Sequence, residues 1–337
     1  MSEYRAVVVG AGGISDAWFN PLKEEKVQVA AVVDLNLERA QGQIAKYQLD
    51  CPAQTDLRAA LRKMRPDFIV DLTVPEAHCA VTCTALRAGC HVIGEKPMAA
   101  TMAQARSMIR AADKAGRLYM VSQSRRWYPL HDVIRRSVAA GVIGTVTTVN
   151  CDFYIGAHFG GFRDQMPSPL ILDMAIHHFD LARALTGTDP LAVYARQFNP
   201  AGSWYAGEAA ASCIFEMTNN VQFTYRGSWC SEGCHTSWNG NWRIVGTAGS
   251  LLYENDQPPV AQVVAGDSGF NRPLRNAELP APTLPHSTMH GALCEMLDFL
   301  RTGRRPQTEC HDNIHSLAMV FAAIDSSRKG RRITIRL

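Results

Sequence analysis

The feature that most restricts the fold is a glycine-rich turn between an apolar strand and a helix near the start of the chain. The apolar run Arg5–Val9 leads into the sequence GAGGIS, and we expect a helix from Ser15 to about Lys23. A first glycine permits the tight turn, a second lets a pyrophosphate approach the backbone, and the helix N-terminus offers free N–H groups to that phosphate. The pattern predicts a dinucleotide-binding turn, although Ser15 stands where a third Gly or Ala is usual. The residues expected to contact the cofactor here are Gly10, Gly12, Gly13 and Ile14.

An acidic residue follows the next strand at the distance that a dinucleotide site requires. The strand Val27–Val33 ends at Asp34, whose carboxylate can accept a hydrogen bond from a ribose 2′-hydroxyl. The same carboxylate would repel the 2′-phosphate of NADP, and Arg39 lies about one helical turn too far to compensate. The sequence therefore predicts NAD rather than NADP as the cofactor.

Strands and helices alternate through the first third of the chain. Expected helices are Leu57–Met64, a helix from Pro75 that stops at Gly89, and one that begins at Thr101 and stops at Gly116; expected strands are Asp67–Leu72, Cys90–Gly94 and Leu118–Val121. Strands separated by helices of this length indicate a parallel, doubly wound sheet. We expect this Rossmann domain to span residues 1–122.

Two charged residues end one of these strands. The strand Cys90–Gly94 runs into Glu95-Lys96-Pro97, and the proline cannot continue a central strand because it lacks an N–H group. The carboxyl ends of strands are where ligands bind in open α/β sheets. Glu95 and Lys96 are therefore candidate site residues, against the alternative of a solvated loop.

The second part of the chain, residues 123–337, has the pattern of an α+β domain with a largely antiparallel open sheet. Sequential strands Ala209–Met217 and Val221–Trp229 are joined by a short turn. Other expected elements are a helix Leu130–Ala140, strands Val146–Tyr154, Trp242–Val245 and Ser250–Tyr253, an irregular segment 256–285, helices Ser287–Leu300 and Asp312–Arg328, and a closing strand Arg332–Leu337. We expect helices to cover one sheet face and leave Phe215, Phe223, Tyr225 and Trp229 on the other, which predicts a homodimer or homotetramer.

A helix over Leu170–Leu185 carries a second candidate group. Asp173 and His177 are four residues apart and share one face, which Asp180 could also share, whereas His178 points about a quarter-turn away. An Asp–His pair on a solvated helix is the common alternative. The segment LILDMAIHHFDLARAL is too apolar for that alternative, so we treat the pair as a candidate site.

Composition narrows the function classes. The formal net charge is +3 with no long basic run, no apolar stretch approaches a membrane span, and the amino end lacks a signal-peptide pattern. We therefore expect neither nucleic acid nor membrane as a partner. Ten scattered cysteines indicate a reduced, cytoplasmic protein. The Cys/His groupings 230–235 and 310–315 lack the paired spacing of a zinc site, so we expect no metal.

These motifs together resemble the Gfo/Idh/MocA family, the glucose–fructose oxidoreductases and inositol dehydrogenases. The resemblance covers nearly the whole chain and rests on G-x-G-x-x-S, Asp34, T-V-P-x-x-H at Thr73–His78, and A-G-C-H-V-I-G-E-K-P, of which E-K-P is the most specific. It implies cofactor contacts by Thr73, Pro75, His78, Glu95 and Lys96. Near Asp173 the chain departs from the family pattern, because Pro167-Ser168-Pro169 replaces glycines.

The resemblance also implies roles in catalysis and substrate binding. Histidine is the natural base near neutral pH, a carboxylate can orient it, and a lysine can stabilise a developing alkoxide. We accordingly expect His177 as base, Asp173 as its partner and Lys96 as stabiliser, all three touching the substrate. Arg125, Tyr128 and Trp238 are further candidate substrate contacts, each with a structural alternative: an interdomain surface for the first two and a core position for the tryptophan.

Three functions fit this resemblance. The leading one is NAD-dependent oxidation of a secondary ring hydroxyl of a sugar, cyclitol or sugar derivative, with a sugar or polyol as substrate. A second is the family branch that uses bound NAD transiently and hydrolyses a glycosidic bond. A third is a non-catalytic NAD-binding sensor, which would be expected to lack the Lys96 and His177 residue types.

Overall fold

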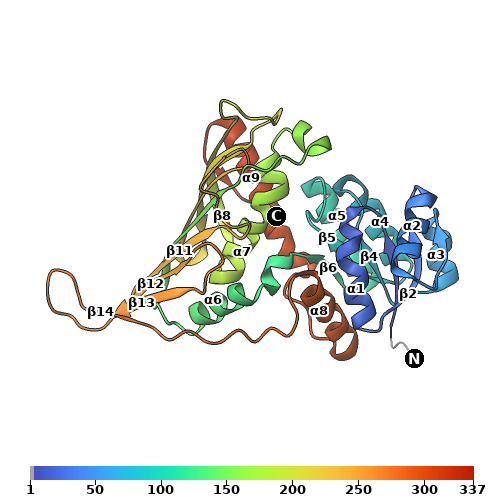
Figure 1. The fold of residues 1–337 in the computed structure, drawn as a ribbon, viewed down its shortest axis with the longest axis horizontal. Helices are drawn as coiled ribbons and strands as arrows, with labels where there is room; N and C mark the ends of the chain where they lie inside the picture. The colour runs from blue at the N-terminus through green and yellow to red at the C-terminus, as the bar shows by residue number, and fades with distance from the viewer. Residues whose placement is uncertain (1–3) are drawn as a thin grey trace. The chain divides into compact units, whose positions relative to one another are not determined.

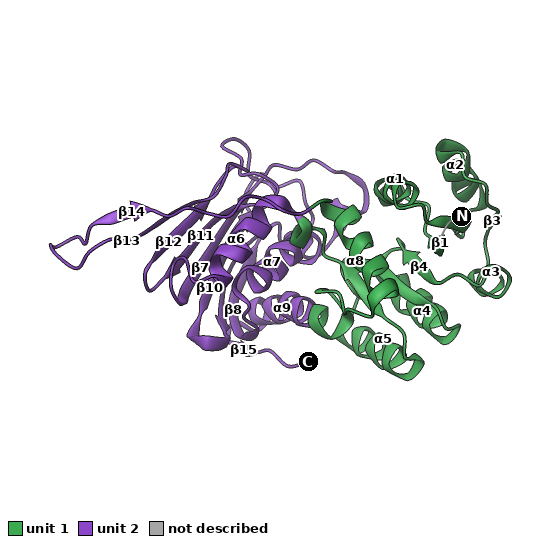
Figure 2. Cartoon of the chain, turned by 90° about the horizontal axis from the view of Figure 1, so that it is seen from below, with its two compact units in different colours: residues 1–127, 285–314 green, residues 128–284, 315–337 purple. Residues whose placement is uncertain are grey.

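The chain folds into two compact units, and each unit is made of two separate segments of the sequence. A computed structural model describes residues 4–337; residues 1–3, at the amino end that we expect to lack a signal peptide, lie outside this range. Unit 1 comprises residues 1–127 and 285–314, and unit 2 comprises residues 128–284 and 315–337 (Figure 2). The first boundary falls five residues after the predicted one, whereas the return of 285–314 to unit 1 is not in the predicted linear division.

Unit 1 is built on a parallel sheet of six strands in the order β3-β2-β1-β4-β5-β6 (Figure 1). The strands are β1 (Arg5–Val9), β2 (Gln28–Val33), β3 (Ala53–Gln54), β4 (Phe68–Asp71), β5 (His91–Glu95) and β6 (Tyr119–Ser122). This is the strand order of a Rossmann fold, with the order reversing between β1 and β4. The predicted Rossmann sheet is confirmed.

The helices of unit 1 are α1 (Asp16–Glu24), α2 (Leu37–Tyr47), α3 (Leu57–Met64), α4 (Pro75–Arg87), α5 (Met102–Ala115) and α8 (Thr288–Thr302). Of these, α2, α3 and α5 have a side-chain N-cap. The Thr101 hydroxyl accepts the Gln104 N–H at the start of α5, and Gly116 ends that helix in the left-handed region. Helix α2, capped by Asn36, is not among the predicted elements.

Helix α8 belongs to unit 1 because its apolar face is buried there. It packs against α1 and against the short helix η2 (Ser124–Trp127). Gly291 makes this close approach to η2 possible, since a Cβ atom at this position would lie 2.5 Å from the Cβ of Trp127. Leu293 and Met296 on the same helix are fully buried.

Unit 2 contains a nine-stranded sheet in the order β14-β13-β12-β11-β7-β10-β9-β8-β15. Its strands are β7 (Val146–Tyr154), β8 (Pro190–Phe198), β9 (Ala210–Met217), β10 (Gln222–Ser228), β11 (Asn241–Gly246), β12 (Gly249–Tyr253), β13 (Val260–Val264), β14 (Leu274–Asn276) and β15 (Ile333–Thr334). All neighbours are antiparallel except β7 and β10, so the predicted largely antiparallel sheet is confirmed. Strands β13 and β14 lie in the segment predicted to be irregular, and that part of the prediction is wrong.

The helices of unit 2 are α6 (Pro129–Ala139) and α7 (Ile176–Thr186). Helix α9 (Cys310–Lys329) contains the last boundary between the units, after Ile314. The expected helix over Leu170–Leu185 is not uniform. Its first part, η4 (Leu170–Ala175), is a π-helix, and α7 continues from it. The wider π turn changes the angular spacing between Asp173 and His177 from the one that an α-helix would give.

The four aromatic residues predicted to lie on an uncovered sheet face are instead buried. Phe215, Phe223 and Tyr225 are fully buried, and the ring of Phe179 from α7 lies 4.8–6.2 Å from all three rings. Trp229 is also buried. Side chains alternate along a strand, and these four occupy positions on the covered side. The prediction for these residues is wrong.

Candidate active site

The turn after β1 requires glycine at its first position. Gly10 has φ +98°, and a Cβ atom there would lie 2.7 Å from the carbonyl carbon and oxygen of Leu72. Its N–H donates to the Val33 carbonyl at 2.8 Å, which ties the turn to the end of β2. The turn is therefore fixed at the point where the strand order reverses.

The next two glycines leave room for a ligand. Nothing lies within 4 Å of a Cβ atom built on Gly12 or Gly13, and Ile14 beside them is partly exposed. The Ser15 hydroxyl, fully buried, donates to the Gly12 carbonyl at 2.7 Å. Ser15 thus closes the turn in place of the usual third glycine, and the open space above Gly12 and Gly13 fits a pyrophosphate group.

Asp34 follows β2 and lies against the same turn. One of its carboxylate oxygens accepts the Ala11 N–H at 2.7 Å, and the other accepts the Asn36 N–H at 2.8 Å. Each carboxylate oxygen retains a lone pair for a further donor. The negative charge is therefore held beside the glycine turn, as the adenosine ribose of NAD would require.

A buried carboxylate that the sequence analysis missed organises the end of β4. Asp71 is fully buried and accepts the hydroxyls of Thr73 at 2.6 Å and of Thr82 at 3.1 Å; His78 Nδ1 lies 3.1 Å from it. Pro75 begins α4 between these residues. Thr73 and His78 are thus positioned together by Asp71, and the signal available in the sequence was an acid at the end of an apolar strand.

The end of β5 places a buried acid next to a half-buried lysine. The indole N–H of Trp18 donates to Glu95 at 3.0 Å, so the Glu95 side chain contacts the polypeptide. Burial raises the pKa of the Glu95 carboxyl, while the bond from Trp18 acts in the opposite direction. Lys96 follows directly, and its backbone N–H lies 3.3 Å from the same carboxyl group.

The two arginines after β6 differ in role. Arg126 is buried and donates to the Gln307 carbonyl at 2.7 Å and to Asp312 at 2.8 Å, so it fixes the first turn of α9 within unit 1. Arg125 lies beside it in η2 and is half-buried. The candidate substrate contact Arg125 therefore sits on an element anchored by its neighbour.

In unit 2, Asp173 has a partner that the sequence analysis did not identify. Arg163 donates to the Asp173 carboxylate at 2.6 Å, and its guanidinium lies over the rings of Phe159 and Phe162 at 4.9 and 4.8 Å. Asp173 belongs to the π-helical turn, and His177 is a buried residue of the first turn of α7. In the sequence, Arg163 follows Gly160 and Gly161 in an expected loop. That pattern does not indicate which residue the Arg163 side chain contacts.

The neighbouring residues of α7 have separate surroundings. His178 is fully buried, with the rings of Phe153, Tyr225 and Trp242 at 4.9, 5.6 and 6.1 Å. Asp180 accepts the Ser316 hydroxyl of α9 at 2.7 Å. Asp180 is therefore engaged in packing α7 against α9.

Aromatic side chains of unit 2 form a partly exposed group. Phe159 and Trp238 are 45% and 46% exposed, their ring centroids lie 6.1 Å apart, and Phe159 also packs edge-on against Trp229. Tyr128 lies elsewhere in the unit, with its ring 4.9 Å from His131, and burial and then Asp256 raise its pKa. Of the candidate substrate contacts, Trp238 has the exposed apolar face that a sugar ring needs.

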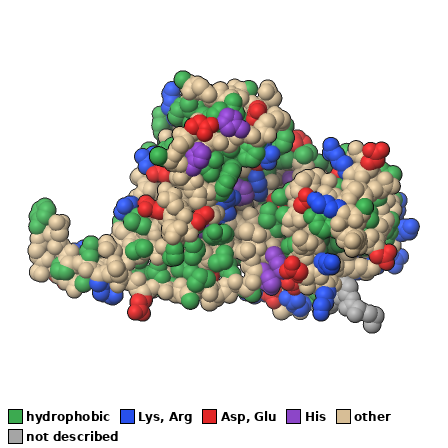
Figure 3. Space-filling model, viewed as in Figure 1, with side chains coloured by type: hydrophobic (Ala, Val, Ile, Leu, Met, Phe, Trp, Pro, Cys, Tyr) green, Lys and Arg blue, Asp and Glu red, His purple; other side chains and the backbone are tan. Residues whose placement is uncertain are grey.

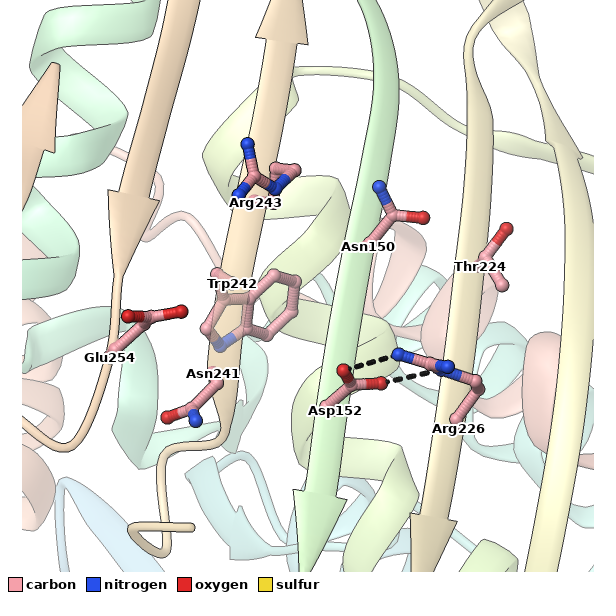
Figure 4. A pocket seen from close by; sticks show the side chains of 8 residues that line it. All are labelled: Asn150, Asp152, Thr224, Arg226, Asn241, Trp242, Arg243 and Glu254. Carbon is pink, nitrogen blue, oxygen red and sulfur yellow. Dashed lines mark hydrogen bonds and ion pairs between the residues drawn. The ribbon is translucent and has the colours of Figure 1, made fainter. Parts of the chain in front are cut away.

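A separate depression lies on the outer face of the unit 2 sheet. Its polar lining includes Asn150, Asp152 and Arg226, and Arg226 donates twice to Asp152, at 2.8 and 2.6 Å (Figure 4). These side chains alternate with the buried ones along β7 and β10. The depression is therefore on the opposite sheet face from α7 and its histidines.

Two groups of metal-ligand residue types come together within residues 4–337. One is Glu309, Cys310 and His311, and the other is Glu25, His286, His290 and Cys294. The sequence analysis weighed Cys310 and His311 but missed the second group, whose signal was the repeated spacing of four among its last three members.

No helix within residues 4–337 is long and apolar enough to cross a membrane. On the face that Figure 3 shows, acidic and basic side chains are interspersed and not gathered by sign.

Comparisons with known proteins match both parts of the chain. Residues 4–123 match the model described as oxidoreductase family, NAD-binding Rossmann fold, and residues 131–252 match the GFO/IDH/MocA C-terminal domain. The chain is 25% identical over 352 residues to D-apiose dehydrogenase of Paraburkholderia graminis, covering 100% of this chain and 91% of that protein. It is 23% identical over 285 residues to inositol 2-dehydrogenase of Rhizobium meliloti, covering 80% and 81%.

Among solved structures, levoglucosan dehydrogenase in complex with NADH and levoglucosan has the same fold. Its TM-score is 0.84 at 17% identity, and the alignment covers 99% of this chain and 100% of that one. The likeness extends over both units.

Proposed function

Because the chain belongs to the GFO/IDH/MocA family of oxidoreductases with an NAD-binding Rossmann domain, we propose that it oxidises a secondary ring hydroxyl of a sugar, cyclitol or sugar derivative. The observation that carries this proposal is the placement of Asp173 in the π-helical turn η4 and of His177 in the first turn of α7, in a unit that also exposes the aromatic faces of Phe159 and Trp238. An acid–base pair in the same unit as sugar-compatible rings suits this chemistry.

The proposed roles follow from what alcohol oxidation requires. When bound, NAD supplies the acceptor for the hydride. His177 takes the hydroxyl proton, and Asp173 orients the imidazole and favours its protonated form. Lys96 places a positive charge toward the oxygen on which negative charge develops. Arg163, through its 2.6 Å bond to Asp173, fixes the carboxylate.

The proposed substrate class rests on two arguments. Relatives across both units are named for apiose and inositol, a sugar and a cyclitol. Independently, partly exposed rings such as Trp238 can pack against the C–H face of a sugar ring, while Arg125 and Tyr128 can bond to its hydroxyls.

The test is a panel of sugars, cyclitols and polyols assayed for NADH formation, with Lys96→Ala as the matched variant. We expect one class to reduce NAD, and Lys96→Ala to lower turnover about 10²–10³-fold, the usual loss for one donor to an oxyanion. Its affinity for NAD should stay within a few-fold, measured by fluorescence titration. Undiminished turnover in Lys96→Ala would remove Lys96 from the mechanism.

The same panel separates the alternatives. Release of an aglycone from glycosides without net NADH formation would identify a glycoside hydrolase that uses bound NAD transiently. Tight NAD binding without turnover of any compound would favour a sensor.

We also propose a cytoplasmic location, since the ten cysteines form no disulfide in the structure.

A further inference from the structure

Four side chains of unit 1, none of them assigned to catalysis, direct metal-binding atoms toward one point. Glu25 directly follows α1, His286 precedes α8, and His290 and Cys294 lie on α8, which packs against α1 (Figure 1). One ligand atom from each of the four lies within 4.8 Å of every other. This convergence involves two elements far apart in the sequence.

A single carboxylate oxygen is the centre of the group. Oε1 of Glu25 lies 2.8 Å from His290 Nε2, 3.6 Å from Cys294 Sγ and 3.7 Å from His286 Nε2. The two imidazole rings are stacked with their centroids 3.8 Å apart. Both histidines therefore present the same ring nitrogen to the same place.

These separations match what a tetrahedral zinc ion requires. With Zn–N and Zn–O bonds near 2.1 Å and Zn–S near 2.3 Å, neighbouring ligand atoms lie about 3.3–3.6 Å apart. The 3.6 Å contact of Cys294 with Glu25 has this length, and the 3.7 Å contact of His286 is close to it. The 2.8 Å contact of His290 with Glu25 is shorter than this range and must lengthen for an ion to enter.

An ion pair alone explains part of this arrangement. An ion pair between His290 and Glu25 would explain the 2.8 Å contact, but it leaves unexplained why a thiol and a second imidazole approach the same oxygen. A metal ion would account for both imidazoles and the thiol at one point, since all three are groups that zinc binds.

The surrounding backbone and side chains have features that ligand residues commonly show. Cys294 follows His290 by four residues, so both project from one face of α8. Thr288 has φ +53°, a strained value for a β-branched residue, and it lies in the turn that brings His286 back over His290. Glu24 lies 3.6 Å from Nδ1 of His290, where a carboxylate can orient a metal-binding histidine.

We propose that Glu25, His286, His290 and Cys294 form a zinc-binding site. Two imidazoles, a thiolate and a carboxylate are ligands that zinc accepts, and four protein ligands leave no open position, so the site is structural. It replaces the expectation of no metal. The ion would fasten α8 to the end of α1, the helix that follows the dinucleotide-binding turn.

The experiment measures metal in the full-length protein without a histidine tag. We expect close to one zinc ion per chain by mass spectrometry after exhaustive desalting. Replacing the zinc with Co²⁺ should give a thiolate-to-cobalt absorption band that disappears in Cys294→Ser. His286→Ala changes a partly exposed side chain, so the variant should still fold. Its affinity for zinc should fall at least ~100-fold, which exceeds the usual effect of losing a residue that only contacts a ligand.

His311→Ala is the matched control, since it removes an exposed histidine from the other Glu/Cys/His group of the same unit. It should keep full metal content and the cobalt band. Zinc added to the chelator-treated protein should raise its melting temperature, and should do so much less in His286→Ala. The proposal would be overturned if the wild-type protein lacked stoichiometric zinc. It would also be overturned if Cys294→Ser and His286→Ala both kept the zinc content and zinc affinity of the wild type.

Discussion

At the scale of single residues, two consecutive histidines of α7 have different surroundings and should have different functions. His178 is fully buried and packs among the rings of Phe153, Tyr225 and Trp242. His177 follows the π-helical turn that carries Asp173. The pair therefore offers a test of the proposed base with a neighbour as control.

We expect His177→Ala to lose at least ~10²-fold in turnover, within the usual range for general acid–base catalysis, and Asp173→Asn to lose activity as well. The rate of alcohol oxidation should rise with pH through one group, and this step should be absent in His177→Ala. His178→Ala should retain turnover per folded molecule and lose stability to urea, because it leaves a cavity in an aromatic core. An inactive His178→Ala beside an active His177→Ala would reverse the assignment.

The choice between NAD and NADP should depend on Asp34. Asp34→Ser removes the charge that repels a 2′-phosphate, so the ratio of kcat/KM for NAD over NADP should fall at least about tenfold, equivalent to 1.4 kcal/mol. Both cofactors should also bind more weakly, because the bond from the Ala11 N–H is lost. Arg39→Ala is the control and should leave the ratio unchanged. A wild-type preference for NADP would contradict this role.

Residues within one motif could be predicted from the sequence, whereas partners from elsewhere in the chain could not. Gly10, Asp34 and Lys96 each follow a strand, and a strand end defines a position in a parallel sheet. Arg163 reaches Asp173 from a separate loop, and Asp71 gathers residues whose hydrogen bonds depend on the packing of α4. Periodicity holds no information about such contacts.

At the scale of elements, β5 connects a pH-sensitive residue to the proposed site. Its first residue, His91, accepts the Leu118 N–H of the next segment at Nδ1, at 2.8 Å. Burial, and then the nearby Arg117, lower the pKa of His91 to about 4 from 6.5. Since this folded-state pKa lies below the unfolded one, the stability from neutral His91 is complete above about pH 6.5 and is lost as the pH falls toward 4.

We expect His91→Asn to reduce the loss of stability between pH 6.5 and pH 4. The asparagine carbonyl can accept the same Leu118 N–H but does not titrate. Urea midpoints of both proteins, measured at several pH values across this range, give the comparison. Equal pH dependence in the two proteins would show that His91 is not the responsible group.

Element boundaries were predictable where capping residues mark them. Thr101 and Gly116 enclose α5 as predicted. A 3.6-residue periodicity could not reveal the π turn of η4, because its sequence LILDMA is apolar at every position but Asp173 and so marks no single face. Strand β8 was missed for another reason. Leu191 and Tyr194 are apolar yet about half exposed on it, which hides the usual alternation.

At the scale of the whole molecule, the division into units could not be read from local patterns. The amphipathic pattern of α8 shows that one face of the helix is buried. It does not indicate whether that face packs on unit 1 or on unit 2. Its assignment to unit 1 depends on contacts with α1 and η2, such as the Gly291–Trp127 approach. Zinc between α1 and α8 would strengthen this long-range connection.

The outer face of the unit 2 sheet offers a different basis for a homo-oligomer from the predicted one. Tyr194 and Ile214 are paired across β8 and β9 and are 50% and 44% exposed, with Phe198 further along β8 at 45%. Beyond them the face turns polar around the Asp152–Arg226 pair (Figure 4). An apolar area with a polar surround is typical of an interface, and we propose that a second copy of this chain covers it.

We therefore expect light scattering at micromolar concentration to return at least twice the 37.0 kDa mass of one chain. The double variant Tyr194→Glu, Ile214→Lys should shift the mass toward the monomer. The interface would then have to bury charged side chains from both copies, which is unfavourable. Both side chains are exposed within the unit, so circular dichroism should show an unchanged fold. Arg110→Glu, on α5 of unit 1, is the control for added charge and should keep the oligomer. A wild-type protein that scatters as a monomer would remove the interface, and an oligomer that survives the double variant would place it on another surface.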